Sequence, residues 1–194
     1  MNAIFMPGCG VNREYKGEVS KTMEYLQQHF DEVKLHEVCC KVDVDRPKAD
    51  VFIYACFGCY PRMLAKDMAN EYYSIYEIFE KYGLPVKPKE SNKEITLGIH
   101  ECSKLKEDQV NKDLMRSTLL KLGYNIEESQ IISNDFDKCS KVLCLTDKEN
   151  GLSILEDSLK NYKTDEIICV CKGCVAHINK TSKNATHLFD QIFK

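Results

Sequence analysis

The sequence predicts an α/β fold with two pseudo-repeated lobes, each a small, mostly parallel sheet with flanking helices. Three observations predict it: short apolar runs alternate with helical patterns, cysteines follow most of the apolar runs, and the pattern of the first half recurs in the second. The predicted lobes cover residues 1–84 and 94–194. The polar stretch 85–93 contains two prolines and is expected to be a linker or surface loop between them.

In the first half, the apolar runs 3–6, 32–36 and 50–55 are the expected strands. A helix is expected after the first strand, where apolar residues recur at spacings of three and four over 19–30. A second, long helix is expected to carry apolar residues at the same spacings from 64 to 79 and to end at Gly83.

In the second half, strands are expected at 95–99, 131–132, 142–145 and 166–170. Helices are expected around 113–122, around 152–159, and from Cys174 to the carboxyl terminus. Apart from the strand at 142–145 and the helix around 152–159, the order of elements matches that of the first half.

Charge and hydropathy exclude several classes of function. The 194 residues have a formal net charge of −3 with no basic block, so nothing predicts binding to nucleic acid or to an anionic membrane. No apolar stretch approaches the roughly 20 residues of a transmembrane helix, and the first residues do not resemble a signal peptide. We therefore expect a cytoplasmic protein without a transmembrane segment.

Eleven cysteines are the unusual feature of the composition. An odd number of cysteines in a chain without an export signal favours reduced thiols in metal binding or redox chemistry over a disulfide framework. Cys144 and Cys169 lie inside apolar runs and are expected to be buried structural residues. The others follow predicted strands, and the carboxyl ends of parallel strands share one edge of a sheet, where ligand sites form. The corresponding cysteines of the two halves are Cys9 with Cys102, Cys39 with Cys139, Cys56 with Cys171, and Cys59 with Cys174.

Three interpretations of these cysteines remain open. Two thioredoxin-like Cys-x-x-Cys motifs would account for Cys56 with Cys59 and for Cys171 with Cys174, but not for the rest. Structural zinc takes four ligands, which the second half supplies. An iron–sulfur cluster has several iron atoms and suits the first half, whose five cysteines include the vicinal pair Cys39-Cys40. Adjacent Cα atoms lie about 3.8 Å apart, which is closer than the Cα atoms of a relaxed disulfide. A disulfide between Cys39 and Cys40 is therefore not expected.

The pattern of one cysteine, a Cys-Cys pair and a Cys-x-x-Cys motif, present twice, resembles the duplicated cysteine-rich CCG-domain family, which includes the cysteine-rich subunit of heterodisulfide reductase. The resemblance covers nearly the whole chain. It departs from the family at Lys41, where a glycine is usual, and at Ser140, which stands in place of a second vicinal cysteine.

The resemblance implies an iron–sulfur protein that takes part in electron transfer, and in disulfide reduction, at a non-cubane [4Fe-4S] cluster. The cluster ligands that it implies are Cys9, Cys39, Cys40, Cys56 and Cys59, and the further metal ligands are Cys102, Cys139, Cys171 and Cys174. Zinc or a second cluster would occupy the second repeat. The implied partners are a redox protein or subunit and a disulfide or thiol substrate; the alternatives are a non-catalytic electron relay and a zinc-binding protein.

Overall fold

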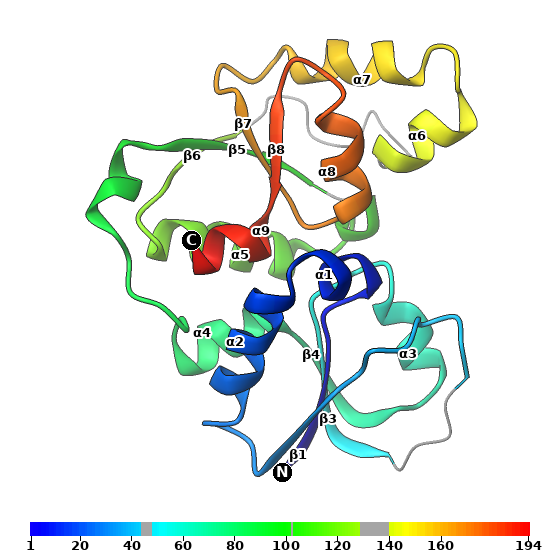
Figure 1. The fold of residues 1–194 in the computed structure, drawn as a ribbon, viewed down its shortest axis with the longest axis vertical. Helices are drawn as coiled ribbons and strands as arrows, with labels where there is room; N and C mark the ends of the chain where they lie inside the picture. The colour runs from blue at the N-terminus through cyan, green and yellow to red at the C-terminus, as the bar shows by residue number, and fades with distance from the viewer. Residues whose placement is uncertain (44–47, 102, 129–139) are drawn as a thin grey trace. The chain divides into compact units, whose positions relative to one another are not determined.

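A computed structural model describes residues 1–43, 48–101, 103–128 and 140–194. The chain forms two compact units, Met1–Pro85 and Val86–Lys194. In each unit the described residues form one four-stranded sheet in which every pair of neighbouring strands is parallel, with helices on both faces (Figure 1). The predicted α/β fold with two pseudo-repeated lobes is therefore confirmed.

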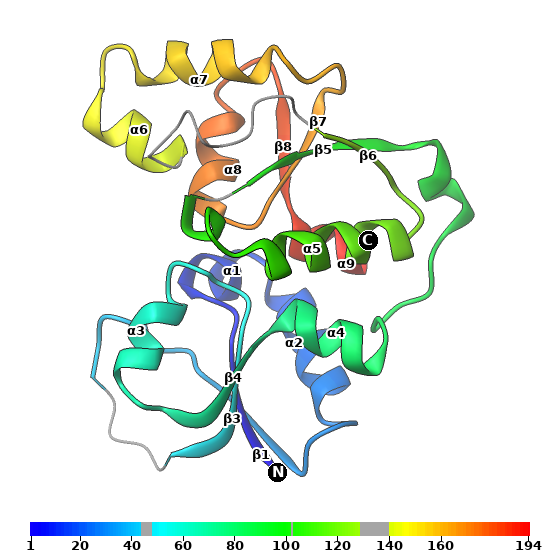
Figure 2. The same ribbon diagram turned by 180° about the vertical axis from the view of Figure 1, so that it is seen from behind.

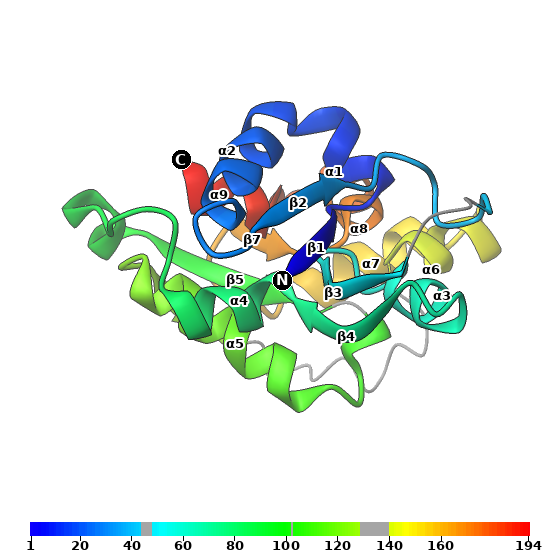
Figure 3. The ribbon, with the colours of Figure 1, turned by 90° about the horizontal axis from the view of Figure 1, so that it is seen from below.

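The first unit has the strand order β2-β1-β3-β4, which Figure 3 shows from below. Its strands are β1 (Asn2–Met6), β2 (Glu32–Leu35), β3 (Ala49–Tyr54) and β4 (Ala69–Ser74). Its helices are α1 (Cys9–Glu14), α2 (Lys16–Leu26), α3 (Tyr60–Ala65) and α4 (Ile75–Tyr82). The first three strands agree with the predicted runs to within a residue or two.

The central strands β1 and β3 are almost wholly buried, which explains why they read as continuous apolar runs in the sequence. Helices α2 and α4 pack together on one face of the sheet, where the Tyr25 and Phe79 rings lie 5.6 Å apart and His29 stacks on Tyr82 at 4.5 Å. Helix α3 covers the other face (Figure 1). Both faces of the sheet are thus closed, and its carboxyl edge carries the loops that hold the cysteines.

The long helix predicted over 64–79 is wrong, because the chain breaks there into α3, β4 and α4. Asp67 adopts a positive φ of 50° just after α3. Ser74 begins α4 with a capping box, in which its hydroxyl accepts from the Glu77 N–H and the Glu77 carboxylate accepts from the Ser74 N–H. The predicted end of the helix at Gly83 is confirmed, with φ of 90°.

The second unit has the strand order β6-β5-β7-β8, which matches the order of the first unit (Figure 2). Its strands are β5 (Thr96–His100), β6 (Asn125–Glu127), β7 (Glu166–Cys169) and β8 (Asn184–His187). Its α-helices are α5 (Gln109–Lys121), α6 (Ser140–Thr146), α7 (Gly151–Leu159), α8 (Lys172–Ile178) and α9 (Leu188–Phe193), and short 3-10 helices lie at Glu90–Glu94 and Ser103–Leu105.

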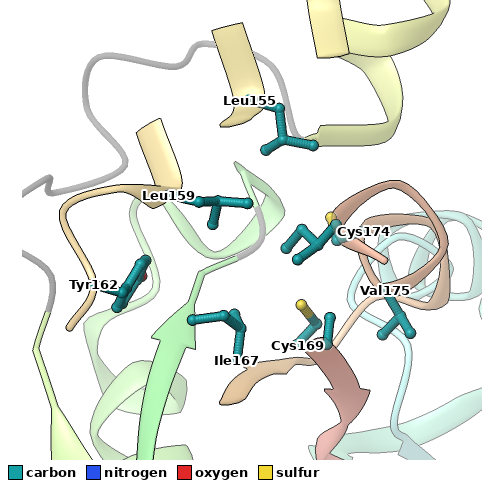
Figure 4. Close-up of a cluster of buried hydrophobic side chains, with 9 residues drawn as sticks. Leu155, Leu159, Tyr162, Ile167, Cys169, Cys174 and Val175 are labelled. Carbon is teal, nitrogen blue, oxygen red and sulfur yellow. The ribbon is translucent and has the colours of Figure 1, made fainter. Parts of the chain in front are cut away.

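Helices α7 and α8 cover one face of this sheet and enclose an apolar cluster (Figure 4). The cluster consists of Leu155, Leu159, Tyr162, Ile167, Cys169, Cys174, Val175, Ile178 and Ala185. On the other face, α5 and α9 lie side by side (Figures 1 and 2), and the hydroxyl of Tyr124 at the end of α5 donates to Gln191 of α9 at 3.1 Å. The second unit is thus also closed on both faces.

Two expectations for the second half are wrong. Residues 142–145 belong to helix α6 and not to a strand, and the segment after α8 contains β8 before the last helix begins. The strand expected at 131–132 lies outside the described residues. Within the part of the chain that the structure describes, no helix has the length and apolar character needed to cross a membrane.

Candidate functional site

The candidate site lies at the carboxyl edge of the first sheet, where the chain reverses its direction across the sheet. The chain passes from β1 outward to β2 and then returns to β3 on the other side of β1. In open α/β sheets, ligands bind in the crevice at such a switch point. Cys9 follows β1, and Cys56 follows β3. The switch point of the first unit is therefore bordered by cysteines.

Gly8 brings the two bordering loops into direct contact. Its φ is +93°, and a Cβ atom at this position would lie 2.6 Å from the Cβ of Cys56 and 3.3 Å from its Sγ. Only glycine adopts this backbone conformation easily and leaves room for the cysteine side chain. The glycine before Cys9 therefore sets how closely the loops after β1 and β3 approach.

The five cysteines of the first unit meet in one group, which we call the thiol pocket. Hydrogen bonds join Cys9 to Cys39 and Cys39 to Cys40. Further hydrogen bonds join Cys40 to Cys59 and Cys59 to Cys56. The five sulfur atoms thus form a continuous chain across the loops that follow β1, β2 and β3. None of the nine cysteines that the structure describes forms a disulfide.

Local backbone turns hold these thiols in place. The carbonyl of Cys56 accepts from the N–H of Cys59 at 3.0 Å and from the N–H of Tyr60 at 3.2 Å, which folds the Cys-x-x-Cys segment back on itself. The carbonyl of Cys39 accepts from the N–H of Val42 at 2.9 Å. Each turn places two cysteines near each other, so the pocket is built from short-range structure at three strand ends.

The surroundings of Cys39 favour ionisation of its thiol. The backbone N–H of Lys41 donates to its sulfur, and so does the thiol of Cys9, and together they lower the pKa of the Cys39 thiol. For Cys9 the direction is opposite. Burial of its sulfur is the main cause that raises the pKa of its thiol, and the neighbouring Cys39 is the second. The thiol of Cys39 therefore ionises more easily than the thiol of Cys9.

At the inner end of the pocket, the hydrogen bond to Cys56 and then burial raise the pKa of the Cys59 thiol. The side chain of Cys59 is almost completely buried, whereas Cys9 is exposed. The pocket therefore runs from an outer pair that favours a thiolate to an inner thiol that stays protonated.

Tyr76 lies beside the inner end of the pocket and is a residue that the sequence did not single out. Its side chain is fully buried, and its ring stacks on Phe57, the residue between Cys56 and Gly58, with centroids 6.1 Å apart. Because Tyr76 belongs to an aromatic run with helical spacing, the sequence favours an ordinary core residue. Nothing in the sequence pattern indicates its contact with Phe57.

The described cysteines of the second unit lie in and around an apolar cluster. Cys174 lies in the apolar cluster beside Cys169, and Cys171 packs against the same cluster while remaining partly exposed. Cys169 is fully buried, as predicted, whereas Cys144 is only partly buried. The predicted ligands Cys102 and Cys139 lie outside the described residues.

A histidine–serine contact occupies the carboxyl end of β5 instead. The Nε2 atom of His100 lies 2.7 Å from the hydroxyl oxygen of Ser140, the first residue of α6. Burial lowers the pKa of His100 to about 4, against weaker opposing effects of Cys171 and Glu101. The imidazole is therefore neutral near pH 7, and its contact with the serine holds the start of α6 against the end of β5.

This burial predicts that acid destabilises the second unit. The folded-state pKa of His100 lies below the ordinary value of 6.5, so the contribution to stability is complete above pH 6.5 and is lost as the pH falls toward 4. Between pH 7 and pH 4, we expect the difference in unfolding free energy between wild type and His100→Gln to shrink by at most about 3 kcal/mol. Urea unfolding of both proteins measures it, and a constant difference across this pH range would contradict the prediction.

Comparisons with known proteins give little beyond this geometry. No family model matches the chain, and no curated protein does. A solved structure of glutamate racemase isoform RacE1 from Bacillus anthracis is similar to 99% of this chain and 78% of its own length, with a TM-score of 0.41 and 10% sequence identity. Identity and TM-score at this level say nothing about what this chain does.

These findings correct the assignment to the CCG-domain family. No family model matches the chain, so the assignment has no support. The function drawn from that resemblance is corrected with it, because no family model supports an iron–sulfur electron-transfer protein, an oxidoreductase similar to heterodisulfide reductase, or an electron relay.

The metal-binding character expected of these cysteines is not supported either. Within residues 1–43, 48–101, 103–128 and 140–194, no three side chains of histidine, cysteine, aspartate or glutamate are placed to hold a metal ion. The cofactor assignment and the nine ligand cysteines stay predictions.

Proposed function

We propose that the thiol pocket of the first unit is a nucleophilic thiol site, in which the Cys39 thiolate attacks a small molecule that bears a soft electrophilic carbon. The observation that carries this proposal is the continuous chain of hydrogen-bonded thiols at the switch point of the first sheet. Hydrogen-bond donors directed at one sulfur stabilise its thiolate, and the thiolate is the reactive form of cysteine.

The reaction places each group in a defined role. The Cys39 sulfur forms a bond to the electrophilic carbon, and the leaving group departs with its electron pair. The backbone N–H of Lys41 and the thiol of Cys9 hold the sulfur charge before the attack. Lys41 also lowers the pKa of Cys39 through its positive charge, so an anionic substrate would meet a favourable local field. We place the protein in the cytoplasm, because a reactive thiolate persists in a reducing compartment.

Alkylation by iodoacetamide tests the proposal without knowledge of the substrate. Cys144 is the matched control, because it is partly buried like Cys39 but burial raises the pKa of its thiol. At pH 7 we expect Cys39 to be modified at least about tenfold faster than Cys144. Peptide mass spectrometry after timed quenching measures both rates in one sample, and equal rates would contradict the proposal.

The variant Cys9→Ala tests the role of the outer pair. It removes one donor to the Cys39 sulfur, so alkylation of Cys39 at pH 7 should slow and should require higher pH, while the rate at Cys144 should not change. Metal analysis of protein purified without oxygen is the second part of the experiment. Stoichiometric iron or zinc that disappears in Cys39→Ser would overturn the proposal, because a metal-bound thiolate is not available as a nucleophile.

A further inference from the structure

The turn that carries Cys39 is held from outside by a lysine. The carbonyl of Cys39 accepts from the N–H of Val42 at 2.9 Å, which closes a turn in the loop after β2. The ammonium group of Lys66 donates to the carbonyl of Val42 at 2.7 Å and forms an ion pair with the carboxylate of Asp43, also at 2.7 Å. One side chain therefore binds two successive residues at the end of the turn.

Lys66 is itself held by helix α3. It directly follows this helix, and its backbone N–H donates to the carbonyls of Arg62 and Met63, each at 3.2 Å. The side chain of Met63 is fully buried, so the end of α3 is anchored in the core. Only 24% of the Lys66 side chain is exposed, compared with 43% for Lys48, which pairs with Asp67, the next residue after Lys66. The contacts of Lys66 are therefore better sheltered from water than the neighbouring ion pair.

Helix α3 meets the turn at both of its ends. At the start, Cys59 directly precedes the helix, and its thiol is hydrogen-bonded to the thiol of Cys40, which lies within the turn. At the end, the ammonium group of Lys66 binds the last carbonyl of the turn. Cys39 is the first residue of the turn, and its thiol is hydrogen-bonded to the thiol of Cys9. The two attachments to α3 therefore restrict where the Cys39 sulfur lies relative to Cys9.

We propose that Lys66 is a positioning residue of the thiol pocket, which holds the turn Cys39–Val42 against α3 so that the Cys39 sulfur stays beside the Cys9 sulfur. The inference rests on the proposed function, because it assigns the support of the same site. It requires no particular charge on any thiol, since Lys66 binds a carbonyl and a carboxylate. A reactive group is placed precisely only where further contacts hold its loop, and Lys66 supplies such a contact.

Cross-linking by dibromobimane tests the inference. Each of the two carbon–bromine bonds of this reagent is replaced by a carbon–sulfur bond, with release of bromide and of the thiol proton. After one end has reacted with Cys9, the other end either bridges to Cys39 or is capped by added cysteamine. The ratio of bridged to capped product therefore reports how near the second thiol stays. Peptide mass spectrometry measures this ratio.

In Lys66→Met, we expect the ratio to fall at least about threefold, because the turn loses a charge-assisted hydrogen bond. Lys48→Met is the matched control, since it removes the same charge from an ion pair of 2.6 Å at the same end of α3, and its ratio should stay unchanged. Lys66→Arg should restore most of the ratio, because a guanidinium donates to the same carbonyl and carboxylate. The melting temperatures of Lys66→Met and Lys48→Met should agree within about 4 °C, because each variant loses a partly exposed ion pair.

Equal ratios in the wild type and in Lys66→Met would overturn the inference, and so would an equal fall in Lys48→Met or no recovery in Lys66→Arg. A wild-type protein that forms no bridge between Cys9 and Cys39 would overturn it as well. The alkylation rates of Cys39 and Cys144 in the wild type test the proposed function, whereas the ratio of bridged to capped product tests the role of Lys66. Failure of either one is therefore recognised separately.

Discussion

The variant Gly8→Ala is expected to destabilise the first unit strongly and to disturb the thiol pocket. Gly8 has φ of 93° and ψ of 149°, a conformation that alanine avoids at a cost of about 1–3 kcal/mol. The added Cβ would lie 2.6 Å from the Cβ of Cys56, so the loop after β3 must also shift. Overpacking of this kind costs about 1–3 kcal/mol more. We therefore expect a total loss of about 2–6 kcal/mol.

Urea unfolding measures this loss, and Gly17→Ala is the matched control. Gly17 lies in α2, and nothing approaches within 4 Å of an added Cβ there. Alanine is the better helix former, so this control should leave stability equal or raise it by up to about 1 kcal/mol. If Gly8→Ala and Gly17→Ala had the same free energy of unfolding, the result would contradict the close contact between Gly8 and Cys56. Alkylation of Cys56 should change in Gly8→Ala and not in Gly17→Ala.

Removal of the Glu101 carboxylate is expected to destabilise the second unit by about 3 kcal/mol. Glu101 follows β5 and accepts from Lys112 at 3.1 Å and from Arg116 at 2.7 Å, both on α5. Only 9% of the Lys112 side chain and 13% of the Glu101 side chain are exposed, so their charges are shielded from water. In Glu101→Ala, Lys112 keeps the carbonyl of Lys106 as an acceptor, but its charge loses the carboxylate that compensates it.

Glu128 supplies the matched control for this network. It binds the same Arg116 at 2.5 Å, but 56% of its side chain is exposed. Exposed ion pairs contribute little, so Glu128→Ala should cost less than about 1 kcal/mol. The double variant Glu101→Leu with Lys112→Met should recover much of the lost stability. It removes both charges of the buried Glu101–Lys112 pair, so neither charge is left without its partner. Chemical denaturation of the four proteins measures these differences, and a double variant no more stable than Glu101→Ala would contradict the explanation.

The sequence predicted the central strands of each sheet better than the edge strands. The buried strands β1, β3, β5 and β7 were found because strands covered on both faces are continuous apolar runs. The edge strands β4, β6 and β8 were missed. In β4, the residues Ala-Asn-Glu-Tyr-Tyr-Ser include two exposed side chains, and the larger apolar ones fall at spacings that also suit a helix. Periodicity alone does not separate a short edge strand from a helical turn.

The sequence predicted where the cysteines of the first unit gather, and their role as ligands stays a prediction. The placement of cysteines after strands correctly indicated that Cys9, Cys39, Cys40, Cys56 and Cys59 would share one edge of the first sheet. The same reasoning treated Cys174 as an equivalent ligand, which stays a prediction; the structure places its side chain in an apolar cluster with Cys169. A Cys-x-x-Cys spacing does not specify which side of a helix start faces the core. The family resemblance rested on that spacing, and the comparisons do not support it.

The sequence by itself determined two parallel α/β units and the presence of cysteines at their strand ends, because burial on both faces and the order of strands and turns are properties of local sequence. Only the tertiary structure decided which thiols touch, that Gly8 packs on Cys56, and that the Tyr76 ring stacks on Phe57. These are contacts between loops that are distant in sequence. Their distances depend on how strands, turns and helices pack in three dimensions, and no local pattern of residues encodes them.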